Sequence, residues 1–171
     1  MTMKKFFFMA VLLMATALTM TSCGSDEPEE TITATATYNI TFSQDLLNAC
    51  NVFIIYKAEN GRNVMEAVTS SWWTKTVTSD KFPAEFGVMY KFSPKSDADL
   101  TQEQYDLTCD MNFSCKTTKG ASYTNNMTII NASDVSKDKV VSTINKYNGK
   151  SVGFRITKDG IVSAANNLNY E

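Results

Sequence analysis

The sequence contains no histidine. Imidazole is the usual general base for serine and cysteine nucleophiles and a common ligand in catalytic zinc sites. Its absence argues against a triad hydrolase and against a typical zinc hydrolase. We therefore expect a protein that is not an enzyme and that needs no metal and no cofactor.

The chain also lacks a cluster of basic residues. It has 16 lysines and arginines against 18 aspartates and glutamates, which gives a formal net charge of −2. Proteins that bind nucleic acid usually carry a basic patch that neutralises phosphates. The composition therefore predicts no nucleic-acid partner.

Long apolar runs are absent after about residue 20. The one such run, Phe6 to Met20, follows the cationic pair Lys4 and Lys5. This order of charge and apolar residues is typical of a signal peptide. The run is shorter than the roughly twenty residues that a membrane-spanning helix needs. We therefore expect a removable export signal.

The residues after this run are Met20, Thr21, Ser22, Cys23 and Gly24. They resemble the bacterial lipobox, although leucine is commonest at the position of Met20; relaxed forms occur in Bacteroidota. The resemblance implies that the Cys23 thiol takes a diacylglyceryl group and that cleavage removes residues 1–22. Acyl chains would then hold the protein to a membrane. The alternative is ordinary secretory cleavage with Cys23 as a structural or free cysteine.

Residues 24–30 are polar and acidic, with Asp26, Glu27, Glu29 and Glu30 around a single proline. Such a segment buries too little apolar surface to fold, so residues 23–31 are predicted to be a tether. The acidic run resembles the surface-export signal of Bacteroidota lipoproteins, which implies the outer face of the outer membrane. The alternative is a linker that happens to be acidic, which would leave the periplasmic face open.

Residues 32–171 are predicted to form a single β-rich domain. Apolar residues alternate with polar ones over Ile32 to Phe42 and again over Tyr105 to Cys115, which indicates half-buried strands. Further strands are expected over 52–56, 64–68, 72–78, 86–92, 123–130, 152–156 and 161–170. One helix is expected near 136–147, followed by Gly149 as its cap. The pattern favours an antiparallel β-sandwich, immunoglobulin-like or similar, over a β-barrel or calyx.

Cysteines are few, and only Cys50, Cys109 and Cys115 follow Cys23. On one strand, Cys109 and Cys115 would lie roughly 20 Å apart, beyond the reach of a disulfide. Cys50 could pair with either one. The alternative is that all three are small buried apolar residues. Their spacing does not support a zinc site.

The adjacent residues Trp72 and Trp73 are candidates for ligand stacking. On a strand they would point to opposite faces, so both cannot lie in the core. An exposed indole can stack on the apolar face of a sugar ring. The alternative is that the second tryptophan packs under a loop or against the helix.

Five acidic residues form the densest acidic stretch of the domain: Asp97, Asp99, Glu103, Asp106 and Asp110. Two carboxylates at a suitable separation could serve a small glycosidase, the one hydrolase chemistry here that needs no histidine. The stretch does not match the calcium loop of an EF-hand. A solvated loop followed by the outer face of a strand explains it as well.

These features together favour a cell-surface lipoprotein with a non-enzymatic binding domain. Its expected partners are a membrane, through lipid on Cys23, and a glycan or another extracellular ligand such as a surface protein. The alternative is a structural or assembly component of a surface appendage or of an outer-membrane transport complex. A small glycosidase is the third hypothesis.

Overall fold

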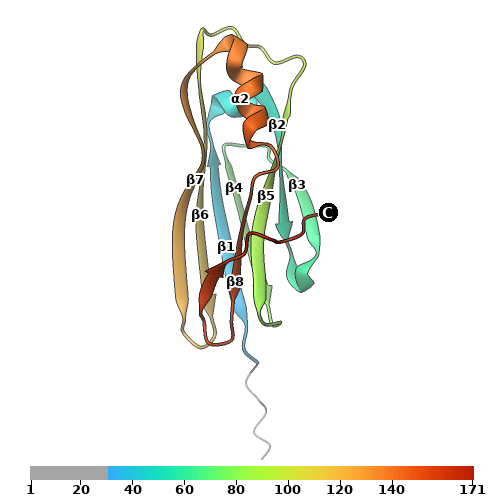
Figure 1. Ribbon diagram of the computed structural model, residues 1–171, viewed down its shortest axis with the longest axis vertical. Coiled ribbons are helices and arrows are strands. Elements are labelled where there is room, and N and C mark those ends of the chain that lie inside the picture. Colours follow the sequence, from blue (N-terminus) through green and yellow to red (C-terminus); the bar gives the residue numbers. More distant parts are fainter. Residues whose placement is uncertain (1–30) are drawn as a thin grey trace, which may run out of the picture. The chain divides into compact units, whose positions relative to one another are not determined.

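The computed structural model describes residues 31–171 (Figure 1). The predicted signal peptide, Cys23 and nearly all of the predicted tether lie outside the described residues. The first strand begins at Ala34, two residues after the predicted start at Ile32. No helix in residues 31–171 is long and apolar enough to cross a membrane.

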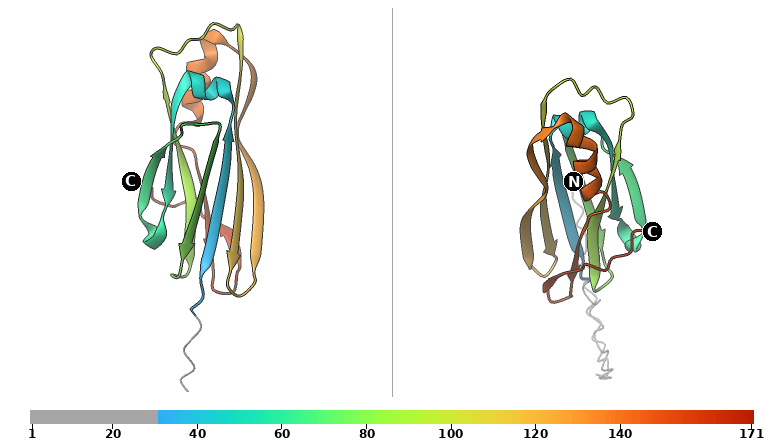
Figure 2. Two further views of the ribbon diagram at one scale, coloured as in Figure 1. Left: turned by 180° about the vertical axis from the view of Figure 1, so that it is seen from behind. Right: turned by 45° about the horizontal axis from the view of Figure 1, so that its top comes forward.

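The described chain forms two antiparallel sheets that pack face to face (Figures 1 and 2). The four-stranded sheet has the order β4 (Trp72–Ser79), β1 (Ala34–Phe42), β6 (Gln104–Thr117) and β7 (Ser122–Ser136). The five-stranded sheet has the order β3 (Asn63–Ala67), β2 (Cys50–Lys57), β5 (Ala84–Pro94), β8 (Ser151–Ile156) and β9 (Val162–Ala164). Within these residues each sheet keeps two open edges and no barrel closes, so the predicted β-sandwich is confirmed.

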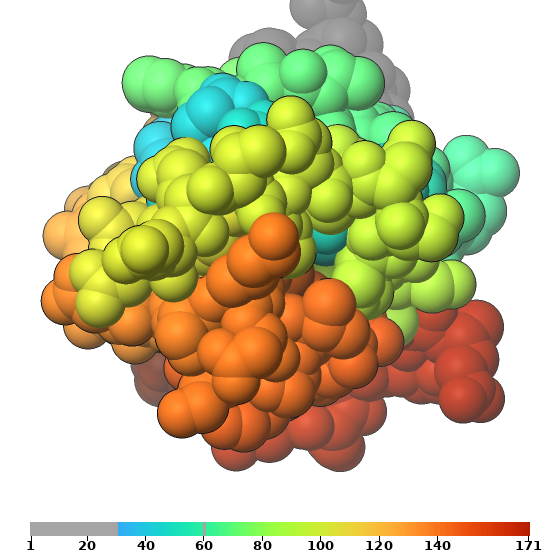
Figure 3. Space-filling model, turned by 90° about the horizontal axis from the view of Figure 1, so that it is seen from above, coloured from blue at the N-terminus to red at the C-terminus, as the bar shows by residue number. Residues whose placement is uncertain are grey.

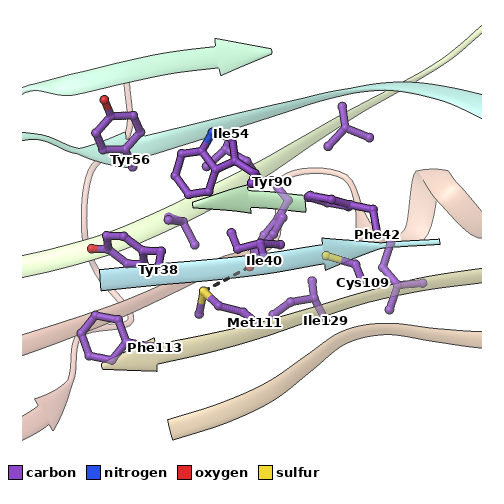
Figure 4. Close-up of a cluster of buried hydrophobic side chains, with 14 of the residues drawn as sticks. Tyr38, Ile40, Phe42, Ile54, Tyr56, Tyr90, Cys109, Met111, Phe113 and Ile129 are labelled. Atoms are coloured by element: carbon purple, nitrogen blue, oxygen red, sulfur yellow. Dashed lines mark hydrogen bonds between the residues drawn. The ribbon is translucent and has the colours of Figure 1, made fainter. Parts of the chain in front are cut away.

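The core lies between the two sheets and is built by the alternation seen in the sequence. Every second residue of β1 and β6 is buried, because successive side chains of a strand point to opposite faces. Figure 4 shows Tyr38, Ile40, Met111 and Phe113 pointing into one cluster with residues of the facing sheet. The Tyr90 hydroxyl donates to the sulfur of Met111 across the cluster, at 3.3 Å.

β7 departs from simple alternation at two bulges. Its register against β6 shifts between Cys109 and Asp110, so Ile129 and Ile130 are both buried although they are neighbours. A second shift lies near Asp134, whose φ of 53° is in the left-handed region that aspartate tolerates better than most residues. The predicted weak strand over 123–130 is therefore the first part of a strand of 15 residues.

Two short helices cover one end of the sandwich (Figure 3). α1 (Gln44–Ala49) begins at Ser43, whose hydroxyl accepts a hydrogen bond from the Leu46 amide. A 3-10 turn, η2 (Lys137–Lys139), leads into α2 (Val140–Tyr147), so the predicted helix is confirmed with its α-helical part starting later. Gly149 follows at φ 78°, as a C-terminal cap requires. A further 3-10 turn, η1 (Glu59–Gly61), joins β2 to β3.

The strand predicted over 161–170 is wrong beyond Ala164, where β9 ends. The remaining tail crosses the outer face of the five-stranded sheet toward β3 (Figure 1). Gly87 and Gly153 are paired on β5 and β8, and their missing side chains leave room for Leu168 and Tyr170. The tail thus packs into a hollow lined by glycine instead of extending a ladder.

Candidate functional site

The outer face of the four-stranded sheet carries short polar side chains at nearly every position. On β1 these are Thr35, Thr37, Asn39 and Thr41, which alternate with the buried residues of the core. The neighbouring strands continue this pattern with threonine, asparagine and serine. Apart from Trp72, Gln104 and Lys116 the side chains of this face are short, so a ligand can approach the sheet closely between them.

Two cross-strand rows lie at the end of this face near α1. The pairing of the strands aligns them as Trp72, Thr41, Asp110 and Thr128 in the first row, and Thr74, Asn39, Asn112 and Asn126 in the second. Adjacent strands are about 4.8 Å apart, so each row spans roughly 14 Å. A row of this length can contact several sugar rings in sequence.

Hydrogen bonds between the side chains hold both rows in place. Thr128 Oγ1 donates to Asp110 Oδ1 at 2.6 Å. Asn112 Nδ2 donates to Asn126 Oδ1 at 2.6 Å, and Thr74 Oγ1 donates to Asn39 Oδ1 at 2.8 Å. Each carboxylate or amide keeps further donor or acceptor capacity for a ligand. The rows therefore present oriented polar groups whose positions are fixed before a ligand arrives.

A shallow groove of about 450 Å³ follows these rows. We call it the Trp72 groove. Its lining residues are Asn39, Thr41, Trp72, Asp110, Met111, Asn112, Asn126, Met127 and Thr128. Ligand sites commonly combine apolar surface with a few placed polar groups. Here the exposed Trp72 ring is the apolar part, since the Met111 side chain is buried in the core.

The two candidate tryptophans have opposite environments. Trp72 is 61% exposed at the end of its row, whereas Trp73 is 8% exposed and lies in the core. The Trp73 ring packs against Tyr56 with 5.7 Å between ring centroids, and its Nε1 donates to Glu66. Of the two predicted stacking residues, Trp72 alone has a ring face available to a ligand.

The five acidic residues do not converge on one site. Asp97 and Asp99 lie in the loop between β5 and β6, and Glu103 ends this loop. Asp106 and Asp110 lie on the same face of β6, four residues or roughly 13 Å apart along the strand. The paired carboxylates of glycosidases are about 5–9.5 Å apart. In residues 31–171 no group of acidic or cysteine side chains is arranged to hold a metal ion.

All three cysteines of the described domain are buried free thiols. Burial raises the pKa of Cys50 to about 12 and that of Cys115 to about 11. Burial also raises the pKa of Cys109, with a further contribution from the charge of Asp110. The three cysteines therefore behave as small apolar core residues. This is the alternative to a disulfide that the sequence left open.

Most lining residues of the Trp72 groove could not be singled out from the sequence. Asn39, Asn112 and Asn126 are far apart along the chain, and only the register of β1, β6 and β7 brings them into one row. The alternation predicts outer faces for Asn39 and Asn112, but it assigns no face to Asn126 and does not show which strands are neighbours. Trp72 was the one visible signal.

Comparisons with protein family models, with curated proteins and with solved structures found no match. The function of the protein is therefore inferred from the geometry of the groove.

Proposed function

We propose that this protein is a cell-surface lipoprotein whose domain binds glycan in the Trp72 groove without catalysis. One observation carries the proposal: a largely exposed tryptophan stands at the end of a flat row of short, hydrogen-bonded polar side chains. Sugar rings offer an apolar C–H face and a rim of hydroxyls. The groove presents a matching surface for each.

Trp72 would stack against one sugar ring, which would then lie over the row it shares with Thr41 and Asp110. Hydroxyls of that ring and of its neighbours would donate to Asp110 and exchange hydrogen bonds with Asn112 and Asn126. Each group is already oriented by a cross-strand bond, so little side-chain entropy is lost on binding. We expect a neutral, linear glycan of about three units that crosses the strands, given the roughly 14 Å length of a row.

The proposed location follows from Cys23. Lipid on Cys23 would anchor the mature chain to the outer membrane, and the acidic residues behind it would carry the domain to the extracellular side. Mass spectrometry of the N-terminal peptide of the purified protein tests the lipid. A peptide that starts at Cys23 with its acyl groups is expected, and an unmodified Cys23 would contradict the anchor. Protease treatment of whole cells tests which side of the outer membrane the domain occupies.

A glycan array tests the binding proposal, with wild type, Trp72→Ala and Met65→Ala compared. Met65 is the matched control, since it is 55% exposed and lies on the other sheet. Loss of an aromatic anchor typically costs about 2 kcal/mol or more, so Trp72→Ala should weaken binding by about 25-fold or more. Met65→Ala should bind as wild type does.

Two outcomes would count against the proposal. Equal retention by wild type and Trp72→Ala would remove the groove as the sugar site. If wild type retained no glycan on the array, glycan would be excluded as the ligand. A second variant, Asn112→Ala, separates stacking from hydrogen bonding, because it should weaken binding while the Trp72 ring remains.

The alternative function, a structural or assembly component of a surface appendage or outer-membrane transport complex, is favoured by a different feature. β7 is a long strand at an open edge of its sheet. Open edges are templates for pairing with another chain. Isolated outer membranes that yielded only monomeric protein would count against this function.

A further inference from the structure

β7 forms the lateral edge of the four-stranded sheet (Figures 1 and 2). It has 15 residues and pairs with β6 on one side only. The backbone N–H and C=O groups on its other side point away from the sheet. Natural proteins usually protect such an edge with lysine, proline or a charged side chain. From Ser122 to Ser133, β7 has none of these.

The other three sheet edges in residues 31–171 are short or protected. β9 has 3 residues and β3 has 5, including the charged Glu66. β4 is longer, but Lys75 lies in its middle and forms an ion pair with Glu66. Charged side chains of this kind oppose the addition of another strand. β7 therefore differs from every other edge in the described domain.

The part of β7 nearest its start is also regular. From Ser122 to Thr128 each residue faces one residue of β6, and both bulges lie beyond this segment. α2 follows the far end of β7 and lies away from the segment (Figure 1). A straight, uncovered and uncharged segment can accept a strand without rearrangement.

We propose that two copies of this chain pair antiparallel through this edge, around a two-fold axis at Asn125. Tyr123 would then face Met127 of the second copy, and Thr124 would face Asn126 of the second copy. These are an aromatic–thioether pair and a hydrogen-bonding pair, and both recur by symmetry. A second copy is favoured over an unrelated peptide because the segment is complementary to itself and carries no charge that would repel its own copy.

The pairing would join two four-stranded sheets into one continuous sheet. The outward side chains Thr124, Asn126 and Thr128 would lie at the centre of its polar face, and the two Trp72 rings would lie at opposite ends. This consequence concerns the same face as the proposed glycan site. The dimer itself does not depend on glycan binding.

Crosslinking of the full-length protein in native membranes tests the dimer. Asn126→Cys places a thiol on the exposed face of β7, about 7–8 Å from its symmetry mate in a diagonal pair. A short bifunctional maleimide should then yield a species of twice the monomer mass. Thr76→Cys is the matched control, because it is also exposed and lies on the same face of the opposite edge strand. Wild type serves as the control for the native thiols.

A second variant adds charge to the edge. Thr124→Lys, introduced with Asn126→Cys, should lower the crosslinked fraction by about tenfold or more, since the two introduced lysines would be like-charged diagonal neighbours in the new pair. Thr74→Lys, on the opposite edge, should leave it unchanged. Equal crosslinking of Asn126→Cys and Thr76→Cys would overturn the proposal. An adduct with a different protein in place of the dimer would also overturn it, and would show that β7 takes another partner.

Discussion

The carboxylate of Glu66 on β3 lies 2.5 Å from the ammonium of Lys75 on β4. These strands belong to different sheets and share no backbone ladder. Glu66 also accepts hydrogen bonds from the Tyr56 hydroxyl at 2.8 Å and from Trp73 Nε1 at 3.2 Å. One carboxylate therefore joins the two edge strands and closes this side of the sandwich.

We predict that this carboxylate makes the stability of the domain depend on acidic pH. Burial alone would raise the pKa of Glu66, but the hydrogen bonds from Lys75, Tyr56 and Trp73 outweigh burial and hold the pKa below its ordinary value. A depressed pKa contributes stability above the unfolded value of about 4.3, and this stability is lost as the pH falls through the folded pKa. Urea unfolding between pH 7 and pH 3 should show this loss.

Glu66→Gln should lower the free energy of unfolding at neutral pH by about 1 kcal/mol, since the group is one-third exposed and water screens it. The difference from wild type should shrink as the pH falls. Glu85→Gln is the control, because Glu85 pairs with Arg155 within one sheet and does not join the two sheets. A difference between Glu66→Gln and wild type that stayed constant over this pH range would contradict the prediction.

The C-terminal tail gives a second prediction. A Cβ at Gly87 would lie 2.3 Å from the Tyr170 hydroxyl and 2.7 Å from the carbonyl oxygen of Val152. Gly87→Ala should therefore displace the tail and lower the free energy of unfolding by about 1–3 kcal/mol. Thermal or urea unfolding measures the loss.

Removal of residues 168–171 separates the contact of that Cβ with Val152 from its contacts with Tyr170 and Leu168 in the tail. The truncation alone should destabilise the domain, because it removes the packing of Leu168 and Tyr170. Gly87→Ala should then cost less in the truncated chain than in the full one, since only the contact with Val152 remains. Equal costs in both chains would mean that the tail does not press on Gly87.

The sequence predicts the core strands well because their environment is uniform. β1 and β6 have one buried face throughout, so their alternation is unbroken and their inward residues can be listed before the fold is known. The helix was found for the same reason, since Val140 and Ile144 are buried at helical spacing. Local pattern suffices where each element contacts the core along its whole length.

Contacts between distant elements explain what the sequence did not show. The bulge at Ile129 shifts the phase of β7, so the strand predicted over 123–130 covers only its first part. The tail does not continue as a strand, because Gly87 and Gly153 on other strands leave a hollow into which it packs. The rows of the Trp72 groove depend on strand order, which alternation does not encode. Trp72 was visible in the sequence, but the polar residues beside it required the register.

The adjacent tryptophans offer the sharpest test of the sandwich. Trp72→Ala should change the free energy of unfolding by less than about 0.5 kcal/mol, because the ring is mostly exposed. Trp73→Ala should cost about 3–5 kcal/mol, because it empties a core site beside Tyr56 and removes a hydrogen bond to Glu66. Urea unfolding of the two variants measures both values.

A third variant separates the two losses at Trp73. Trp73→Phe keeps most of the apolar ring and removes the Nε1 donor, so it should cost less than Trp73→Ala and more than Trp72→Ala. If both alanine variants cost about 3–5 kcal/mol, neither ring would face solvent, and Trp72 could not stack on a sugar. A small cost at Trp73 and a large one at Trp72 would show that Trp72 faces the core and Trp73 faces solvent. The stability of these two neighbours thus tests the geometry on which the proposed glycan site depends, without any glycan.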